Sequence, residues 1–186
     1  LNVLTSLIEE NPLAAGKFTT ALSKVYRYVL EQKSKDLVTV DEELKFAALY
    51  MSLMKMRFED SIVFTMPGTV KDPNAKVVPL SLQLLLENAV KHNQVTPSKK
   101  LHISITEVDE NLIISNNMQP KQVLRESTGV GLRNIKQRYE LLTKSPVIVN
   151  DNNNQFSISI PMLTKETTIM RTQDVYISEK KYQLAK

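Results

Sequence analysis

The hydrophobic residues between Leu1 and Phe58 recur every three or four positions, which is the period of an α-helix. They predict successive helices with apolar faces at Leu1, Leu4, Leu7 and Ile8; at Phe18, Leu22, Val25 and Val29; and at Leu44, Ala47, Met51, Met54 and Phe58. Asn11 and Pro12 are suited to cap and begin the second helix, and Thr39 to Glu42 has the pattern of a capping box for the third. The heptad-like spacing of the second helix favours a partner helix, either in the same chain or in a second copy.

From Ile62 onward the pattern alternates between apolar and polar positions, as in half-buried β-strands, and two helical patterns interrupt it. Strands are predicted at 62–66, at 101–106 with a hairpin to 112–114, and at 147–149 with a hairpin to 156–160. Helices are predicted over 80–93 and 132–143. This mixture of elements indicates an α+β fold.

Composition excludes several classes of protein. The chain has 186 residues, of which 42% are hydrophobic, so it can form a sizeable core. It has no cysteine and two histidines, which argues against disulfides and a zinc site. The net charge of +4 is spread among acidic residues, so we expect no nucleic-acid partner. No apolar run in these 186 residues is long enough to span a bilayer, and we expect no signal peptide within them. Because Leu1 already lies within a helical pattern, we expect a longer parent protein with its membrane anchor upstream.

The helix over 80–93 has more polar residues than a core helix needs. One arc is apolar, and its members are Leu82, Leu85, Leu86, Ala89 and Val90. The opposite arc carries Gln83, Glu87, Asn88, Lys91 and His92, with Leu84 among them. An amphipathic surface helix with a solvated Glu87–Lys91 pair is the plain alternative to a functional site.

Two of the four glycines, Gly129 and Gly131, stand directly before the second predicted helix. Such a pair lets the backbone approach a phosphate, which the free N–H groups and the dipole of the helix attract. A helix entry that needs left-handed torsions would explain the same pair. The Rossmann pattern is absent, since Asn134 occupies the place of its third glycine, and no P-loop occurs.

Together these two segments resemble the N box and the second glycine box of the ATPase superfamily shared by gyrase, MutL, a heat-shock chaperone and the sensor histidine kinases. They are most similar to the LytS-like sensor histidine kinases, over residues 1–163. The residues that carry the resemblance are Leu82, Gln83, Glu87, Asn88, Ala89, Lys91 and His92, then Gly129, Gly131, Leu132, Asn134, Ile135 and Arg138.

The resemblance implies a two-layer α/β sandwich of the Bergerat type, in which helices cover a mixed or antiparallel sheet, preceded by N-terminal helices of a dimerisation bundle. It divides the chain into a partial helical dimerisation and phosphoacceptor region (1–37), an ATP-binding catalytic domain (38–163) and a tail of unknown role (164–186). In this family the phosphorylated histidine comes immediately before residues similar to Leu1 and Asn2, and neither His92 nor His102 matches that position.

The resemblance also implies a site for ATP and Mg²⁺. Asn88 would hold the metal, Lys91 and His92 would neutralise phosphate charge, and the segment Thr128, Gly129, Val130, Gly131 and Leu132 would cradle the phosphates. Glu87 would polarise the nucleophile, although related ATPases can place that residue a turn earlier, where this chain has Leu84. Asn116 and Asn117 lie where the family has an adenine-binding aspartate motif, and a turn that ends a strand is the alternative.

The polar segment from Gln119 to Thr128 is typical of a mobile loop and would correspond to the ATP lid, with Lys121 and Arg125 near the phosphates. The implied function is a histidine kinase of a two-component phosphorelay, with a response regulator and a second copy of the chain as partners. We expect this chain to bind Mg-ATP without phosphorylating itself. A nucleotide-sensing module without catalysis, and an ATPase acting on DNA or on a protein serine, are the alternatives.

Overall fold

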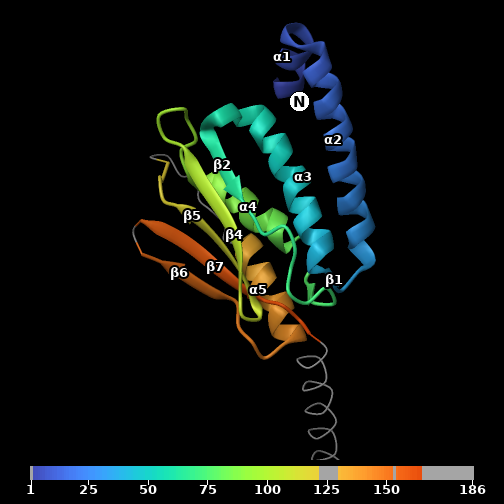
Figure 1. Cartoon of the computed structure of the whole chain (residues 1–186), viewed down its shortest axis with the longest axis vertical. Helices are drawn as coiled ribbons and strands as arrows, with labels where there is room; N and C mark the ends of the chain where they lie inside the picture. The colour runs from blue at the N-terminus through green and yellow to red at the C-terminus, as the bar shows by residue number, and fades with distance from the viewer. Residues whose placement is uncertain (1, 122–129, 153, 165–186) are drawn as a thin grey trace, which may run out of the picture.

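The computed structural model covers the chain, and it describes residues 2–121, 130–152 and 154–164. The helices are α1 (Asn2–Glu10), α2 (Pro12–Glu31), α3 (Val40–Phe58), α4 (Ser81–His92) and α5 (Val130–Leu142). The strands are β1 (Val38–Thr39), β2 (Ile62–Thr65), β3 (Lys76–Val77), β4 (Leu101–Val108), β5 (Asn111–Asn117), β6 (Ile148–Asp151) and β7 (Gln155–Pro161). Short 3₁₀ turns follow α2 and α3, at Gln32–Ser34 and Glu59–Ser61. Figure 1 shows their arrangement.

Five of the strands form one mixed sheet in the order β2-β4-β5-β7-β6. β2 and β4 run parallel, with Ile62 opposite Leu101, and the other neighbours run antiparallel. The predicted hairpins are confirmed, and Asp109 adopts a φ of 51° in the turn between β4 and β5. The small antiparallel pair of β1 and β3 was not predicted, because two-residue strands are too short to show a hydrophobic period.

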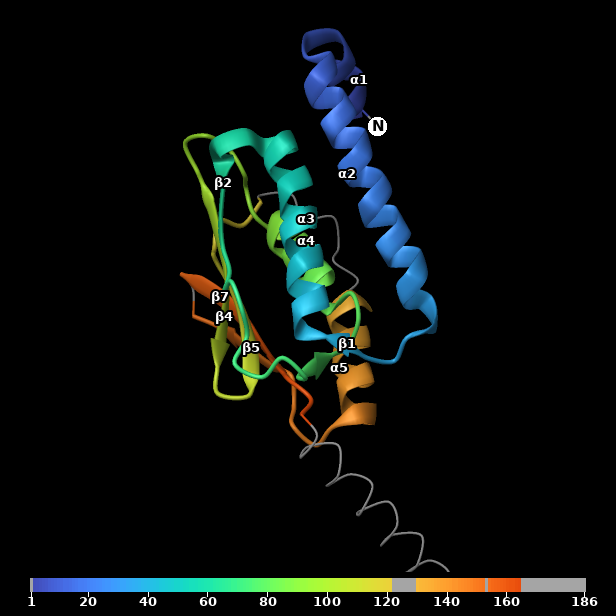
Figure 2. The same cartoon turned by 45° about the vertical axis from the view of Figure 1, so that its right-hand side comes forward.

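Helices α3, α4 and α5 cover one face of this sheet, so the predicted α+β sandwich with a mixed sheet is confirmed (Figure 2). The core lies between the two layers. From α4 it takes Leu82, Leu85, Leu86 and Ala89, and from the strands it takes Leu101, Ile103, Ile105, Leu112, Ile114, Ile158 and Ile160. Burial of these apolar side chains is the main stabilising term of the domain. His102 lies exposed on β4, as its place in the alternation predicted.

The N-terminal helices form a hairpin whose second helix packs against α3. Both predicted caps are confirmed: Asn11 Oδ1 accepts from the N–H of Ala14 at 3.0 Å, and Thr39 and Glu42 form the capping box of α3. Val25 of α2 is buried together with Phe46 and Leu53 of α3. Helix α3 of the same chain is therefore one partner helix of α2.

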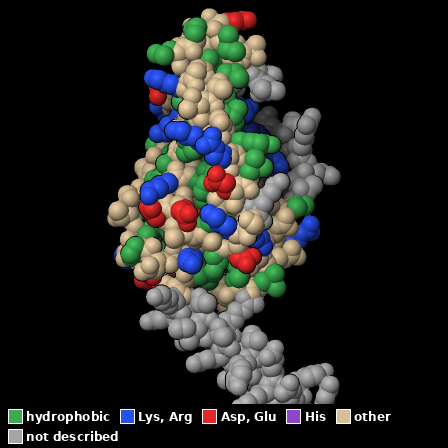
Figure 3. All heavy atoms as spheres, turned by 90° about the vertical axis from the view of Figure 1, so that its right-hand side faces the viewer, with side chains coloured by type: hydrophobic (Ala, Val, Ile, Leu, Met, Phe, Trp, Pro, Cys, Tyr) green, Lys and Arg blue, Asp and Glu red, His purple; other side chains and the backbone are tan. Residues whose placement is uncertain are grey.

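The buried face of α2 differs in one position from the predicted one. Leu22 is 39% exposed, and Ala21 is buried in its place. Ala21 is buried in one cluster with Val25, Phe46 and Leu53, and Tyr28 stacks on Phe46 there with ring centroids 4.1 Å apart. Leu22 turns to the outer side of α2. Hydrophobic side chains reach the surface there among lysines and arginines, as the upper part of Figure 3 shows.

Candidate functional site

A cavity of about 380 Å³ lies between α4, the start of α5 and the strands β5 to β7. This volume lies within the range of small-molecule sites. Its lining combines a few polar groups with apolar surface, and it consists of Asn88, Ala89, Lys91, His92, Asn93, Asn116, Met118, Pro120, Val130, Gly131, Leu132, Asp151 and Phe156.

Helix α4 contributes the polar residues that its sequence pattern singled out. Its apolar arc is buried against the sheet, which turns Asn88, Lys91 and His92 toward the cavity. Asn88 and His92 are half-buried, and Lys91 is exposed. A side-chain amide, an ammonium and an imidazole thus line one small volume, and the Lys91 ammonium attracts an anionic ligand to it.

Glu87 stands beside Asn88 in sequence but does not line this cavity. Its side chain is exposed and forms no ion pair with Lys91 in the described part of the chain. Its charge acts on Tyr50 of α3, where burial and then the negative charge of Glu87 raise the pKa of the phenol to about 12. The chemical role predicted for Glu87 stays a prediction.

Gly131 lies against α4 in the first turn of α5. A Cβ atom at this position would come within 2.8 Å of Leu84 Cδ2, so the absence of a side chain lets the two helices approach closely. Val130, Gly131 and Leu132 all line the cavity. The predicted phosphate-binding residues Thr128 and Gly129 lie outside the described residues, as does Arg125.

Asn116 and Asn117, at the end of β5, have different surroundings. Asn116 is buried and lines the cavity, and its Nδ2 donates to the carbonyl oxygen of Asn117 at 2.7 Å. The Asn117 side chain binds the adjacent β4 backbone, since Oδ1 accepts from His102 N at 2.8 Å and Nδ2 donates to Lys100 O at 3.1 Å. Asn117 is not among the cavity-lining residues, so the predicted pair is divided between the cavity and the backbone at the start of β4.

The carboxyl end of α4 is fastened to the segment that follows β5. Asn93 is buried; its Nδ2 donates to Ala89 O at 2.8 Å, and its Oδ1 accepts from Gln119 N at 2.6 Å. Lys121 Nζ donates to the carbonyl oxygens of Val90 and Lys91 at 3.1 and 2.8 Å. The Lys121 ammonium, which we expected near phosphates, therefore neutralises the negative end of the α4 dipole.

The electrostatics of the cavity favour a neutral His92. Burial lowers the pKa of its imidazole, and the positive charges of Lys91 and Lys121 lower it further. At neutral pH the imidazole is therefore uncharged, and Lys91 supplies the positive charge on this wall.

Six of the lining residues were not among the predicted site residues, namely Ala89, Asn93, Met118, Pro120, Asp151 and Phe156. Asp151 and Phe156 belong to the β6–β7 hairpin, which the strand order places beside β5. The alternation of Phe156 with Ile158 and Ile160 indicated that its side chain faces the helical layer. No local sequence pattern indicated that the helical layer would leave a cavity beside Phe156, at the beginning of β7.

The donor set of the cavity fits a magnesium ion that takes most of its ligands from phosphate and water. Mg²⁺ prefers oxygen ligands and is commonly bound by only one or two protein groups plus phosphate. The Asn88 amide oxygen is such a group. Among residues 2–121, 130–152 and 154–164, no three His, Cys, Asp or Glu side chains gather into a metal cluster. None of the helices described is long and apolar enough to cross a membrane.

Comparison with known proteins gives matches to kinases. Residues 1–62 match the family model described as histidine kinase. The sensor protein kinase HptS of Staphylococcus aureus (strain USA300) is 27% identical over 139 residues, and the same values hold for strain NCTC 8325. The match covers 75% of this chain and 25% of HptS, so the chain spans about a quarter of these relatives.

Solved structures of histidine kinases are also similar. The catalytic domain of histidine kinase ThkA aligns over 67% of this chain and 93% of its own, with 16% identity and a TM-score of 0.45. Histidine kinase AdeS of Acinetobacter baumannii aligns over 86% of this chain and 84% of its own, with 17% identity and a TM-score of 0.44.

Proposed function

We propose that this chain, which is similar to sensor histidine kinases, is the ATP-binding catalytic part of such a kinase. The proposed reaction is transfer of the γ-phosphoryl group of ATP to a histidine side chain. The observation that carries the proposal is the cavity that Asn88, Lys91 and His92 of α4 share with Gly131 at the start of α5. Two sequence motifs that resemble nucleotide-binding boxes thereby border one volume.

The residues of the cavity suit separate parts of Mg-ATP. The Asn88 oxygen would hold Mg²⁺, which neutralises phosphate charge when bound. Lys91 would attract the phosphates, and the free N–H groups of the first turn of α5 would bind their oxygens. The buried amide of Asn116 would contact the adenine. Catalysis of phosphoryl transfer rests mainly on such positioning and charge stabilisation.

Glu87 would act on the incoming histidine rather than on the nucleotide, because its exposed carboxylate lies off the cavity wall. Neither histidine of this sequence is proposed as the acceptor. His92 lines the cavity in which the phosphates would bind, and His102 lies exposed on β4.

A second copy of the chain and a response regulator are the proposed partners. The outer side of α2 exposes Leu22, Tyr26 and Leu30 at 39%, 66% and 46%, spaced four residues apart. They line a shallow groove with Thr19, Ser23 and Arg27. A helical stripe of this kind suits a helix of a second copy. The parent protein is proposed to be a membrane-anchored sensor with this part in the cytoplasm.

Isothermal titration with ATP, in the presence and absence of Mg²⁺, tests the proposed function. We expect Mg²⁺-dependent binding by the wild type. Asn88→Ala should weaken it about 10- to 100-fold, the range for one charge-assisted contact. Glu87→Gln is the matched control, since the adjacent residue on the same helix does not line the cavity, and it should retain the wild-type affinity. Absence of Mg-ATP binding, or equal affinities of the two variants, would refute the assignment.

Incubation with labelled ATP tests the choice of acceptor. We expect no acid-labile phosphate on this chain by itself. Label that appears on the wild type and disappears in His92→Gln or His102→Gln would show that one of these histidines is the acceptor instead.

A further inference from the structure

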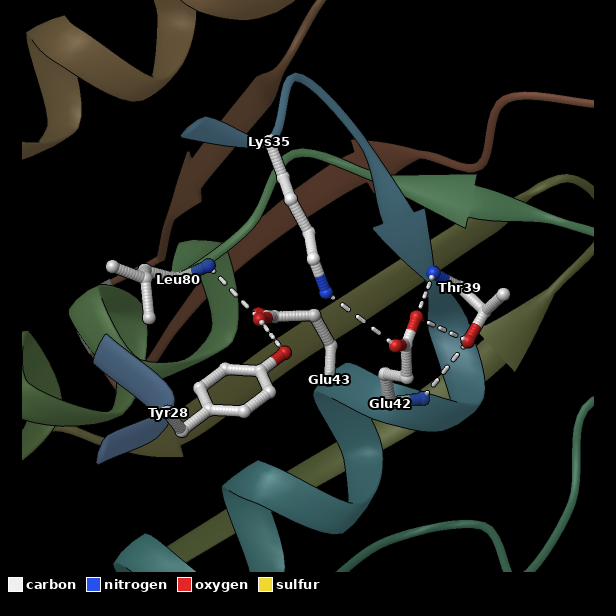
Figure 4. Close-up of polar contacts among 6 residues, drawn as sticks. All are labelled: Tyr28, Lys35, Thr39, Glu42, Glu43 and Leu80. Carbon is white, nitrogen blue, oxygen red and sulfur yellow. Dashed lines mark hydrogen bonds and ion pairs between the residues drawn. The ribbon is translucent and has the colours of Figure 1, made fainter. Parts of the chain in front are cut away.

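Glu43 is a fully buried carboxylate that no step of the proposed reaction uses. It lies in α3, directly after the capping-box residue Glu42, and its side chain points away from solvent. Its surroundings include Tyr28 of α2 and the segment that leads into α4 (Figure 4). A buried carboxylate is retained only where its oxygens are hydrogen-bonded.

Three donors from two other elements bind this carboxylate. Oε1 accepts from the Tyr28 hydroxyl at 3.0 Å and from Leu80 N at 2.9 Å, and Oε2 accepts from Leu82 N at 3.2 Å. Leu80 and Leu82 stand at the beginning of α4, where backbone N–H groups have no partner within the helix. Glu43 therefore supplies from α3 the cap that the α4 sequence does not provide, since Leu80 has no side-chain cap.

The same turn is held from its other side by α5. The N–H of Val78 donates to the Tyr139 hydroxyl at 3.3 Å, and Arg138 Nη1 donates to Pro79 O at 3.3 Å. Leu80 itself adopts a φ of 64°, a left-handed conformation that a leucine keeps only when its surroundings fix it. The turn before α4 is thus bound by α2 and α3 through Glu43, and by α5 through Arg138 and Tyr139.

We propose that Glu43 is a positioning residue that links α2 to α4, so that the position of Tyr28 sets the placement of Asn88 at the cavity. The link runs from the Tyr28 hydroxyl through the Glu43 carboxylate to the backbone of Leu80 and Leu82. A shift of α2 along α3 removes one donor from Glu43 and changes how firmly that carboxylate holds the start of α4. The consequence for ligand affinity rests on the proposed function, whereas the link between α2 and α4 does not.

The test compares Tyr28→Phe with Lys24→Ala in the whole chain, at a temperature at which both are fully folded. Both residues belong to α2, but Lys24 is exposed and lies outside the groove of Leu22, Tyr26 and Leu30, so its substitution is the control. The first readout is the ¹⁵N–¹H amide shift of Leu80 and Leu82, which reports the hydrogen bonds to Glu43 without nucleotide. The second is Mg-ATP affinity by titration.

We expect Tyr28→Phe to move both amide signals and to weaken Mg-ATP binding about three- to tenfold, in the usual range of coupling through a protein. In a double variant with Glu43→Gln, Tyr28→Phe should cause no further loss of Mg-ATP affinity, because both substitutions break the same link. Should Glu43→Gln fail to fold, Tyr28→Phe still decides the question. Unchanged amide signals and Mg-ATP affinity in Tyr28→Phe, as in Lys24→Ala, would overturn the proposal.

Failure of the proposed function gives a different result. A wild-type chain that binds no Mg-ATP refutes the nucleotide assignment. Leu80 and Leu82 amide signals that still respond to Tyr28→Phe would then support the link between α2 and α4 on its own.

Discussion

Gly131 of α5 lies so close to Leu84 of α4 that a Cβ atom on the glycine would come within 2.8 Å of the Leu84 Cδ2 methyl. The two residues belong to the two segments that border the cavity, so their contact fixes the width of one end of it. Gly131 is needed here for close approach rather than for a left-handed torsion.

Gly131→Ala should therefore weaken Mg-ATP binding more than it changes stability. Rotation of the Leu84 side chain can relieve only part of the clash, because Leu84 Cδ1 and Cγ also lie 3.4 Å from the added Cβ. The remaining overpacking costs about 1–3 kcal/mol, which the gain of about 1 kcal/mol for alanine over glycine in a helix partly offsets, so we expect the free energy of unfolding to change by only about 1 kcal/mol. The displaced α5 start should still reduce affinity several-fold. Titration calorimetry and urea denaturation measure the two effects.

Gly16→Ala provides the control for this substitution. Gly16 lies in α2, and a Cβ atom added there would have no neighbouring atom within 4 Å, so alanine fits without a clash. It should stabilise the helix by about 1 kcal/mol and leave Mg-ATP affinity unchanged. Equal affinities in the two alanine variants would show that the Leu84–Gly131 contact does not shape the site.

His92 should titrate in a way that reports phosphate binding. Burial, Lys91 and Lys121 lower its pKa below 6.5 in the free chain, so the imidazole is neutral at pH 7. Phosphate charge beside it should raise that pKa, and binding should then take up a proton. Mg-ATP affinity should rise as the pH falls from 8 to 6, and His92→Gln should remove this rise.

Proton NMR can follow this titration directly, because the chain has two histidines. His102→Gln assigns the signals and should leave the His92 titration unchanged, since His102 lies exposed on β4 away from the cavity lining. A His92 pKa that does not move when Mg-ATP is added would contradict contact with the phosphates.

The sequence predicted those parts of the site that depend on helical period. The apolar arc of α4 determines its buried side, and the opposite arc then presents Asn88, Lys91 and His92 to the cavity. The role of Glu43 was not predictable in this way. Its burial depends on the backbone of Leu80 and Leu82, which are separated from it by 37 and 39 residues and have no donating side chain to signal the contact. The exposure of Leu22 was not predictable either, because the spacing of the large apolar residues does not indicate that the small Ala21 is the residue buried with Phe46 and Leu53.

Asn93→Ala should destabilise the fold by about 1–3 kcal/mol, since it removes the side-chain partner of the buried Ala89 carbonyl and of the half-buried Gln119 N–H. Urea denaturation measures the loss. Asn150→Ala, on exposed β6, is the control and should stay within about 0.5 kcal/mol of the wild type. A similar stability for both variants would mean that Asn93 does not fasten α4 to the segment after β5.

Glu43 and Glu42 are adjacent carboxylates that should affect the pH dependence of stability with opposite sign. Burial, as the largest cause, raises the pKa of Glu43 above 4.5, against the effect of its hydrogen bonds, and the neighbouring Glu42 charge raises it further. The pKa of Glu42 is lowered, chiefly by its hydrogen bond from the Thr39 N–H. The folded chain therefore holds the Glu43 proton to a higher pH than the unfolded chain does, and it releases the Glu42 proton at a lower pH.

These shifts define two pH windows. Above pH 4.5 the unfolded chain loses the Glu43 proton first, so the free energy of unfolding should fall as the pH rises toward the folded pKa of Glu43. Glu43→Gln should flatten this slope. Below pH 4.5 the stabilisation from Glu42 should be lost as the pH falls through its folded pKa. Glu42→Gln should therefore lower the free energy of unfolding by a constant amount above pH 4.5 and change the slope of the curve only below it. Urea denaturation from pH 3 to 8 separates the windows. A Glu43→Gln curve parallel to the wild type above pH 4.5 would show that the three donors, rather than burial, dominate the Glu43 carboxylate.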